Sequence, residues 1–375
     1  MQIVLHPNQL AEMDNEQARE LLRKYNSGQC TENEKALIEK SFFAFNEQSV
    51  EISQEKLKAL KKQVSKKLPI SKSRSLKAII TISTAAAAIV FAIYVFNPRS
   101  ENDVNRSLRI AEQILPRGNT AVITFSNGKT IKLDQHQSEL KIGDYELSYS
   151  DGTKIKMIPS VESQTISTPK GGEYKIVLSD GTKVWLNAAT VLQYPTSFRE
   201  RTERRVKLVS GEAYFEVAKD KNHPFIVSSK NQNLTVLGTH FNINTYDKNV
   251  STTLLEGSVK LNTKNDFASI ILKPGEKSIA DGESFKKTDG DLDLNMAWKN
   301  GKIKFRDADL KSILNEAERW YDIKVEYEDN IPNLHLTGGI SRKSDLSTLL
   351  KLLKMSGINF SLNEKQGTKI LIIKS

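Results

Sequence analysis

The stretch VLSDGTKVWLN (Val177–Asn187) contains residue types that could carry out acid–base or nucleophilic chemistry. Asp180 could act as a general base, Ser179 or Thr182 as a nucleophile, and the backbone at Gly181 as an oxyanion hole. The same residues also fit a tight turn, because Asp-Gly is a preferred centre of β-hairpins. A catalytic interpretation therefore needs other residues that converge on this stretch.

The rest of the chain offers no convergent catalytic or metal-binding motif. The five histidines lie in different segments and form neither an HExxH nor a His-x-His pair: His6, His136, His223, His240 and His335. Carboxylates such as Asp180, Glu212 and Glu216 are scattered over β segments, which leaves a glycosidase-like pair open without favouring it. The single cysteine, Cys30, excludes an intramolecular disulfide framework and a multi-cysteine metal site. We predict a protein that is not an enzyme and uses no cofactor or metal.

One backbone step offers a different chemistry. In VLGTHFN (Val236–Asn242), the hydroxyl of Thr239 could attack the carbonyl carbon of Gly238 in an N–O acyl shift, if the bond between them is strained. The simpler interpretation, which we favour, is that Gly238 allows a tight corner between strands. Self-cleavage between Gly238 and Thr239 is therefore a hypothesis.

Short β-strands must position these residues. Three segments repeat the form apolar–x–Ser–Asx–Gly–x–x–apolar: Ile123–Leu133, Leu147–Met157 and Ile176–Leu186. We predict two-residue hairpin turns with positive φ at both central residues, which makes these four residues structural: Asp151, Gly152, Asp180 and Gly181. Further runs rich in Val, Ile, Thr and Tyr follow, and a β-sandwich and a β-solenoid both fit them.

A hydrophobic segment divides the chain. Leu76–Phe96 has 21 residues with one charge, Lys77, and at about 1.5 Å per residue it is long enough to cross a bilayer as a helix. Its Ser, Thr and Ala content leaves a buried helix as the alternative. Nine basic residues and no acidic one lie from Lys56 to Lys77, so this block carries most of the net charge of +10. The positive-inside rule then predicts a single-pass inner-membrane protein, with residues 1–75 in the cytoplasm and 97–375 in the periplasm.

We predict a multidomain chain with four parts. Residues 1–75 form a small α-helical domain, 76–96 the transmembrane helix, 97–296 an all-β domain, and 297–375 an α/β module of two βαβ-like units. Apolar side chains at helical spacing in the first part are candidate contacts for a partner protein: Leu21, Leu22, Tyr25, Leu37, Ile38 and Phe42. A self-sufficient small bundle is the alternative. In the last part, Thr368–Lys374 is either an exposed edge strand or a strand paired inside its sheet.

Several of these stretches carry a family resemblance. In the β region they are Thr168–Phe198, Gly211–Val227 (GEAYFEVAKDKNHPFIV), Val236–Ile243 (VLGTHFNI) and Leu254–Leu261 (LLEGSVKL). They resemble the FecR family of transmembrane anti-sigma factors, in the long form typical of Bacteroidetes. The opening Leu21–Glu39 is similar to the cytoplasmic segment of that group, and Ala297–Tyr327 to its C-terminal domain, which is related to the secretin/TonB short N-terminal module.

The resemblance implies partners and a mechanism. Residues 1–75 would bind an extracytoplasmic-function (ECF) sigma factor and keep it from RNA polymerase. The periplasmic part would receive a signal from the signalling domain of a TonB-dependent outer-membrane transporter. The β domain would be a solenoid, and proteases acting in or beside the membrane would release the sigma factor. No direct contact with nucleic acid is implied.

A second class of function stays open on the residues alone. A membrane-anchored periplasmic protein could bind a glycan or a cell-wall polymer by stacking Trp185 and Tyr194 on sugar rings. A tryptophan that alternates with Val184 and Leu186 is more often packed in a core, however. A polysaccharide hydrolase would need paired carboxylates, which the sequence does not reveal.

Overall fold

The computed structural model describes residue 31 and residues 99–375, apart from 145, 156–162, 329–332 and 375. The chain divides into two units, Met1–Ser107 and Leu108–Ser375. The predicted cytoplasmic helices and the hydrophobic segment Leu76–Phe96 lie outside the described residues. Within the described part, no helix has the length and hydropathy needed to span a membrane.

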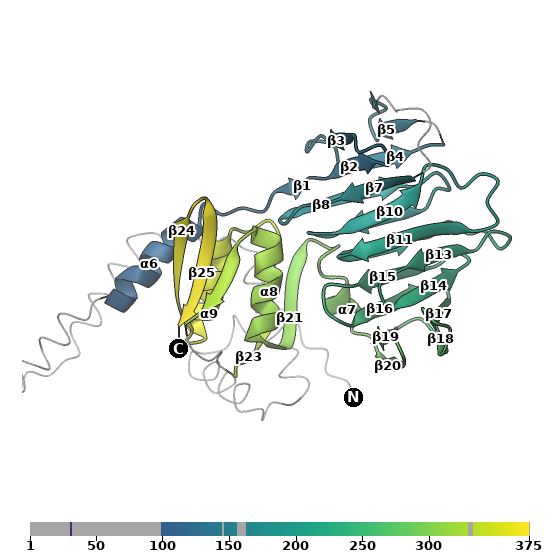
Figure 1. The fold of residues 1–375 in the computed structure, drawn as a ribbon. Coiled ribbons are helices and arrows are strands. Elements are labelled where there is room, and N and C mark those ends of the chain that lie inside the picture. The colour runs from purple at the N-terminus through teal and green to yellow at the C-terminus, as the bar shows by residue number, and fades with distance from the viewer. Residues whose placement is uncertain (1–30, 32–98, 145, 156–162, 329–332, 375) are drawn as a thin grey trace, which may run out of the picture. The chain divides into compact units, whose positions relative to one another are not determined.

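Residues 118–289 form a β domain whose strands belong to two large sheets (Figure 1). The helix α6 (Arg99–Ala111) precedes it. The strands are β1 (Gly118–Asn119), β2 (Val122–Phe125), β3 (Thr130–Lys132), β4 (Glu139–Ile142), β5 (Leu147–Tyr149), β6 (Lys154–Ile155), β7 (Ser163–Ser167), β8 (Gly172–Val177), β9 (Lys183–Leu186), β10 (Val191–Pro195), β11 (Arg204–Ser210), β12 (Glu212–Glu216), β13 (Phe225–Ser228), β14 (Gln232–Val236), β15 (His240–Asn244), β16 (Val250–Glu256), β17 (Val259–Thr263), β18 (Ser269–Leu272), β19 (Glu276–Ala280) and β20 (Phe285–Asp289).

The chain adds hairpins to the two sheets in alternation. The eleven-stranded sheet has the order β20-β19-β16-β15-β12-β9-β8-β4-β5-β6, with β1 beside β8, and the nine-stranded sheet the order β18-β17-β14-β13-β11-β10-β7-β2-β3. Most pairs are antiparallel, whereas β11 with β13, β4 with β8 and β1 with β8 are parallel. The chain therefore advances as a coil that is flattened into two layers. This arrangement is compatible with the predicted all-β, solenoid-like domain.

The alternation of apolar and polar residues explains the core of the β domain. In β8, Tyr174 and Ile176 are buried and the residues next to them are partly exposed, as expected for side chains that point to opposite faces of a strand. The ring of Phe215 in β12 stacks on Phe241 in β15 at 5.1 Å and lies 6.3 Å from Phe225 in β13. These rings come from both sheets, so the apolar faces of the two sheets share one core.

Residues 292–374 form the C-terminal module. Its elements are α7 (Leu292–Asn295), β21 (Lys302–Asp309), α8 (Leu310–Tyr321), β22 (Lys324–Tyr327), β23 (His335–Ser341), α9 (Leu346–Met355), β24 (Asn359–Lys365) and β25 (Thr368–Lys374). From β21 onward their order matches the predicted alternation of strands and helices. Asp309 and Asp345 cap α8 and α9 by accepting backbone N–H groups of the first turn, which explains where these helices begin.

The pairing of these strands differs from the predicted βαβ units. In a βαβ unit the two strands flanking the helix are parallel and lie in one sheet. Here β21 pairs with β23 in a two-stranded sheet, and β22, β25 and β24 form a separate three-stranded sheet. The spacing of apolar residues predicts where each strand and helix lies along the chain. It contains no information on which strand pairs with which in a sheet. β25 lies between β22 and β24, so Thr368–Lys374 is paired inside its sheet and is not an edge.

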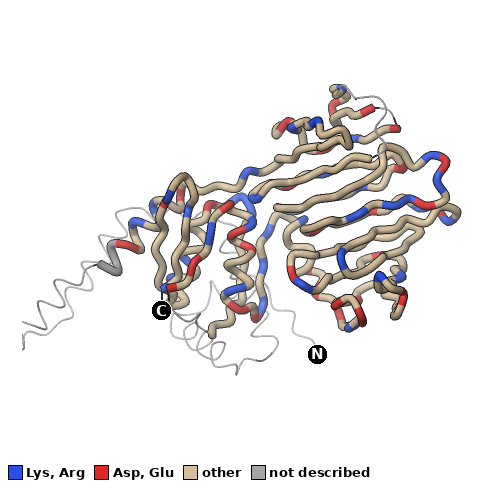
Figure 2. The backbone as a smooth tube through the Cα atoms, viewed as in Figure 1, with Lys and Arg blue, Asp and Glu red and all other residues tan. Residues whose placement is uncertain are grey.

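Charges of both signs are interspersed over the described residues, without one large basic face in the view of Figure 2. This agrees with the composition, since the block from Lys56 to Lys77 accounts for nearly all of the net charge.

Candidate functional site

The stretch VLSDGTKVWLN forms the hairpin between β8 and β9. The N–H of Gly181 donates to the carbonyl of Leu178 at 2.9 Å, and the N–H of Leu178 donates to the carbonyl of Thr182 at 2.8 Å. Gly181 has φ of 84°, whereas Asp180 has no positive φ. The predicted two-residue turn is therefore wrong: the loop has three residues, 179–181, and only its glycine is left-handed.

The three copies of the repeat share this turn. The glycine has positive φ in each: 80° at Gly128, 89° at Gly152 and 84° at Gly181. Oδ1 of each Asx residue accepts the backbone N–H two positions later: Asn127 from Lys129 at 3.0 Å, Asp151 from Thr153 at 2.8 Å and Asp180 from Thr182 at 2.9 Å. Asp151 and Asp180 thus have the same local role, and any difference between them arises from their tertiary contacts.

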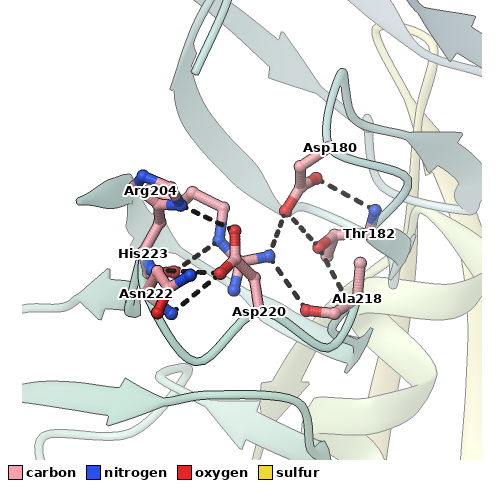
Figure 3. Close-up of polar contacts among 7 residues, drawn as sticks. All are labelled: Asp180, Thr182, Arg204, Ala218, Asp220, Asn222 and His223. Atoms are coloured by element: carbon pink, nitrogen blue, oxygen red, sulfur yellow. Dashed lines mark hydrogen bonds and ion pairs between the residues drawn. The ribbon is translucent and has the colours of Figure 1, made fainter. Parts of the chain in front are cut away.

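Asp180 has a contact that the other copies lack, the ion pair with Arg204 (Figure 3). Its Oδ2 accepts hydrogen bonds from Oγ1 of Thr182 and from Nη1 of Arg204, both at 2.7 Å. Oγ1 of Thr182 in turn accepts the N–H of Ala218 at 3.2 Å, and Thr182 is fully buried. A carboxylate held by a guanidinium and a hydroxyl is not a free base, and a buried hydroxyl with both partners in place is not an available nucleophile. These residues therefore build the scaffold.

Arg204 is the centre of this cluster. The side chain is almost completely buried, with 4% of its surface exposed, and that of Asp180 is 10% exposed. Nε donates to the carbonyl of His223 at 2.8 Å and Nη1 to that of Ala218 at 2.9 Å, while the guanidinium lies 5.4 Å from the ring centroid of Phe225. Arg204 belongs to the nine-stranded sheet and Asp180 to a hairpin of the eleven-stranded sheet. Their ion pair therefore ties the two sheets together.

A polar depression of about 630 Å³ opens beside this cluster, lined by Asp180, Arg204 and neighbouring loop residues. At its rim, Nδ1 of His223 lies 2.8 Å from Oδ2 of Asp220. This hydrogen bond, helped by backbone N–H groups, lowers the pKa of Asp220 to about 2. Arg199 and Asp144, which also line the depression, form an ion pair at 3.1 Å.

The other carboxylates named from the sequence are also engaged. Glu212 is buried and accepts hydrogen bonds from the amides of Asn187 at 2.8 Å and Asn242 at 2.9 Å. Glu216 pairs with Lys299 at 3.3 Å. Among the described residues, no group of three or more His, Cys, Asp and Glu side chains is placed to hold a metal ion.

The two aromatic residues considered for glycan stacking are not open platforms. Tyr194 is buried in the core, where its hydroxyl hydrogen-bonds with Oε1 of Gln164 at 3.1 Å. Trp185 is partly buried, and the ammonium groups of Lys175 and Lys299 lie 4.8 and 4.5 Å from the centroid of its ring. The structure thus contradicts a sugar-binding role for Tyr194 and places lysines where a sugar would stack on Trp185.

Gly238 lies where the backbone approaches another segment closely. A Cβ at this position would lie 2.8 Å from Cα of Lys219, and φ is 151°. The hydroxyl of the buried Thr239 donates to the carbonyl of Ser258 at 3.2 Å. The close approach to Lys219 gives a reason for the glycine that differs from the tight corner expected from the sequence. The hydroxyl of Thr239 is engaged away from the Gly238 carbonyl. Self-cleavage stays an untested hypothesis.

The residues predicted to contact a partner in the cytoplasm all lie outside the described part: Leu21, Leu22, Tyr25, Leu37, Ile38 and Phe42. Their assignment therefore remains a prediction from the sequence.

The sequence did not reveal a junction between the β domain and the C-terminal module. Arg342, whose side chain is 4% exposed, donates from Nη2 to Oδ1 of Asn187 at 2.7 Å and lies 3.6 Å from Glu173. Its guanidinium stacks on the ring of Trp320 at 3.4 Å, and Nε1 of Trp320 donates to the carbonyl of Arg342 at 3.0 Å. Arg342 and Asn187 are 155 positions apart, and no local pattern marks either residue.

A cavity of about 210 Å³ lies at this junction, lined by residues of both parts that include Glu212, Arg319 and Arg342. Glu316 of α8 also lines it. Burial raises the pKa of Glu316 to about 7, although the charges of Arg342 and Arg319 oppose the shift. The carboxyl group therefore titrates near neutral pH at the junction.

Comparisons with known proteins agree with this two-part architecture. Residues 164–260 match the family described as FecR protein, and residues 302–372 the family described as FecR, C-terminal. A crystal structure of a proposed anti-sigma factor from Parabacteroides distasonis is 28% identical, with a TM-score of 0.50, and the match covers 57% of this chain and 100% of that chain. A second such structure from the same organism is also 28% identical, with a TM-score of 0.49, over 55% of this chain and 97% of that chain. No curated protein matches the chain. The chain thus contains a FecR domain followed by a FecR C-terminal domain, and these matches support its membership of the FecR family.

Proposed function

We propose that this protein is an anti-sigma factor that holds an ECF sigma factor through residues 1–75. The observation that carries the proposal is the presence of both FecR domains in one chain, together with the likeness to the Parabacteroides distasonis structure over the whole of that chain. The described part of the β domain supports a regulatory scaffold, because Asp180, Thr182 and Glu212 are engaged in structural contacts.

We also propose that the chain crosses the inner membrane once. The hydrophobic segment Leu76–Phe96 has the length of a spanning helix, and the basic block before it would stay on the cytoplasmic side. The β domain and the C-terminal module would then be periplasmic. The net charge is thereby explained without nucleic acid.

The C-terminal module is the proposed receiver of the signal. A small module can recruit another by pairing edge strands, since an edge strand has backbone groups free for a further partner. β25 is central, which leaves β22 and β24 at the edges of the three-stranded sheet. The proposed partner is the signalling domain of a TonB-dependent outer-membrane transporter, and regulatory proteases would complete the release of the sigma factor.

Co-purification tests the central claim. The tagged full-length chain is extracted in detergent from cells that also express the ECF sigma factor encoded nearest to its gene, and the sigma factor should elute with it. Ile38→Asp puts a charge on the apolar stripe of the predicted helix and should abolish retention. Lys40→Asp lies on the opposite side of that helix, about 200° away, and is the matched control. If the unmodified chain retains no ECF sigma factor of the same genome, the proposal is wrong.

A further inference from the structure

The segment that leads from α6 into the β domain is held by the C-terminal module. We call Glu112–Gly118 the stem. Within it, Ile114 is 1% exposed, and its carbonyl accepts the N–H of Leu346 at 3.0 Å. Leu346 is the first residue of α9, where backbone N–H groups have no partner within the helix. The stem therefore supplies an acceptor that the module itself cannot provide.

Gly171 joins the stem, the β domain and the module at one point. Its carbonyl accepts the N–H of Arg117 at 2.8 Å and that of Gly118 at 3.2 Å, and its own N–H donates to the carbonyl of Arg319 at 2.7 Å. Arg319 lies in the last turn of α8, where carbonyls have no partner within the helix. The helices α8 and α9 thus each have one end completed by a group from outside the module.

Only glycine fits at this point. Gly171 has φ of +74°, and a Cβ there would lie 3.1 Å from the carbonyl oxygen of Trp320 and 3.3 Å from both N and Cγ of Arg117. Two ion pairs flank the same contact: Arg117 with Asp322 at 2.5 Å and Glu112 with Lys351 at 3.6 Å. Both ion pairs are exposed, so they help to orient the stem on the module but contribute little to stability.

The module can separate from the β domain without opening the main core. The large apolar cluster of the β domain runs from Ala121 to Ala280 and includes no residue of the stem or of the module. The apolar cluster at the junction is small and is built by Tyr214, Met296 and Trp298. The other contacts across the junction are mostly polar. Besides those of Arg342 and Gly171, they include the ion pair of Lys299 with Glu216 at 3.3 Å and the hydrogen bond from Nε1 of Trp298 to Oδ1 of Asn242 at 3.3 Å. The guanidinium of Arg319 also lies 4.1 Å from the ring centroid of Tyr246. A small, partly polar interface between two parts of a chain is one that can open while each part stays folded.

We propose that the C-terminal module is a releasable clasp on the stem. When the module is docked, the stem is fixed between Leu346 and Gly171 and Ile114 is inaccessible. When the module undocks, these bonds are lost together and the stem becomes free. The clasp itself does not depend on the proposed function; its use as a relay from a periplasmic partner to the membrane segment rests on that function.

Thiol labelling of the full-length chain in detergent tests the clasp. Cys30→Ser removes the native thiol, and Ile114→Cys then reports on the stem. Arg342→Lys is the decisive variant, because it removes the guanidinium that stacks on Trp320 and donates from Nη2 to Asn187, without touching a stem residue. Gly171→Ala is the second variant. Its matched control is Gly128→Ala, since Gly128 has φ of +80° and no atom within 4 Å of the added Cβ.

We expect the thiol of Ile114→Cys to be labelled about five- to thirtyfold faster in a chain that also carries Arg342→Lys or Gly171→Ala than in one that carries Gly128→Ala. This is the factor that corresponds to a loss of about one to two kcal/mol in the free energy of docking. Ile166→Cys, which is fully buried in β7, should not react faster in any of them. If neither variant makes the thiol of Ile114→Cys react faster, the proposed clasp is refuted. It is also refuted if the thiol of Ile166→Cys reacts faster by the same factor. Retention of the sigma factor is measured separately, so a protected stem without sigma binding refutes only the proposed function.

Discussion

Replacing Asp180 with asparagine should destabilise the β domain, although asparagine is an equally good turn residue. The turn bond to the N–H of Thr182 can be kept by the amide oxygen of the new side chain. The ion pair with Arg204 cannot be kept. The amide that takes the place of Oδ2 would present hydrogens to Nη1 of Arg204, and a guanidinium offers only donors.

The magnitude follows from the burial of the pair. The side chains of Arg204 and Asp180 are 4% and 10% exposed, so little water can reach Arg204 to replace the carboxylate that it loses. Removing one member of a buried pair costs about 3–5 kcal/mol, and we take about 3 because the turn bond survives. For a unit of this size, about 2–4 °C of melting temperature corresponds to 1 kcal/mol, so we expect a decrease of about 6–12 °C.

Thermal unfolding of the full-length chain in detergent, followed by calorimetry at pH 7, measures this decrease. Asp151→Asn is the matched control, because Asp151 occupies the same turn position but is exposed. Its other partners are the amide of Gln137 and the hydroxyl of Thr153, both of which can rotate. It should change stability by less than about 0.5 kcal/mol. A decrease for Asp180→Asn no larger than for Asp151→Asn would show that the Arg204 pair does not stabilise the contact between the sheets.

Two further predictions concern the junction and the Gly238–Thr239 bond. The pKa of Glu316 is raised from 4.5 to about 7, so the stability that its bound proton contributes is fully present below 4.5 and is lost as the pH rises through about 7. Glu316→Gln mimics the protonated form. Its melting temperature should exceed that of the unmodified chain by a difference that grows from pH 4.5 to about 7 and is constant above it. A difference that does not change with pH would contradict the raised pKa of Glu316. The chain should also persist as one full-length band on SDS gels during long incubation, because the Thr239 hydroxyl is engaged with Ser258; fragments that end at Gly238 and disappear in Thr239→Ala would establish self-cleavage.

Local features of the fold followed well from the sequence. The three Asx-Gly repeats occupy the same turn, and the elements of the C-terminal module from β21 onward occur in the predicted order. Such features depend on contacts within a few residues, namely the freedom of glycine at positive φ, the capping of a helix by Asp309, and the spacing of apolar side chains along α8. The turn type was nevertheless wrong, because a two-residue and a three-residue loop accept the same Asx-Gly letters.

Contacts between distant segments did not follow. The sequence left open whether Thr368–Lys374 is an edge, and its apolar character fits either position; the pairing with both β22 and β24 decides it. Tyr194 was considered as a sugar platform, yet the register of β10 turns its ring into the core. The stacking of Arg342 on Trp320 joins two elements of the module whose approach no periodicity predicts.

The sequence by itself determined the positions of the three Asx-Gly turns, the order of strands and helices in the C-terminal module and the family resemblance, because each of these depends on neighbours along the chain. It also determined the hydrophobic segment Leu76–Phe96 as a prediction. Only the tertiary structure decided that Asp180 is the counter-charge of a buried arginine and not a base, because Arg204 reaches it from another sheet across 24 positions of chain. The identical turn at Asp151 has no such partner. The difference between the two aspartates is therefore a property of the packed sheets, not of the motif.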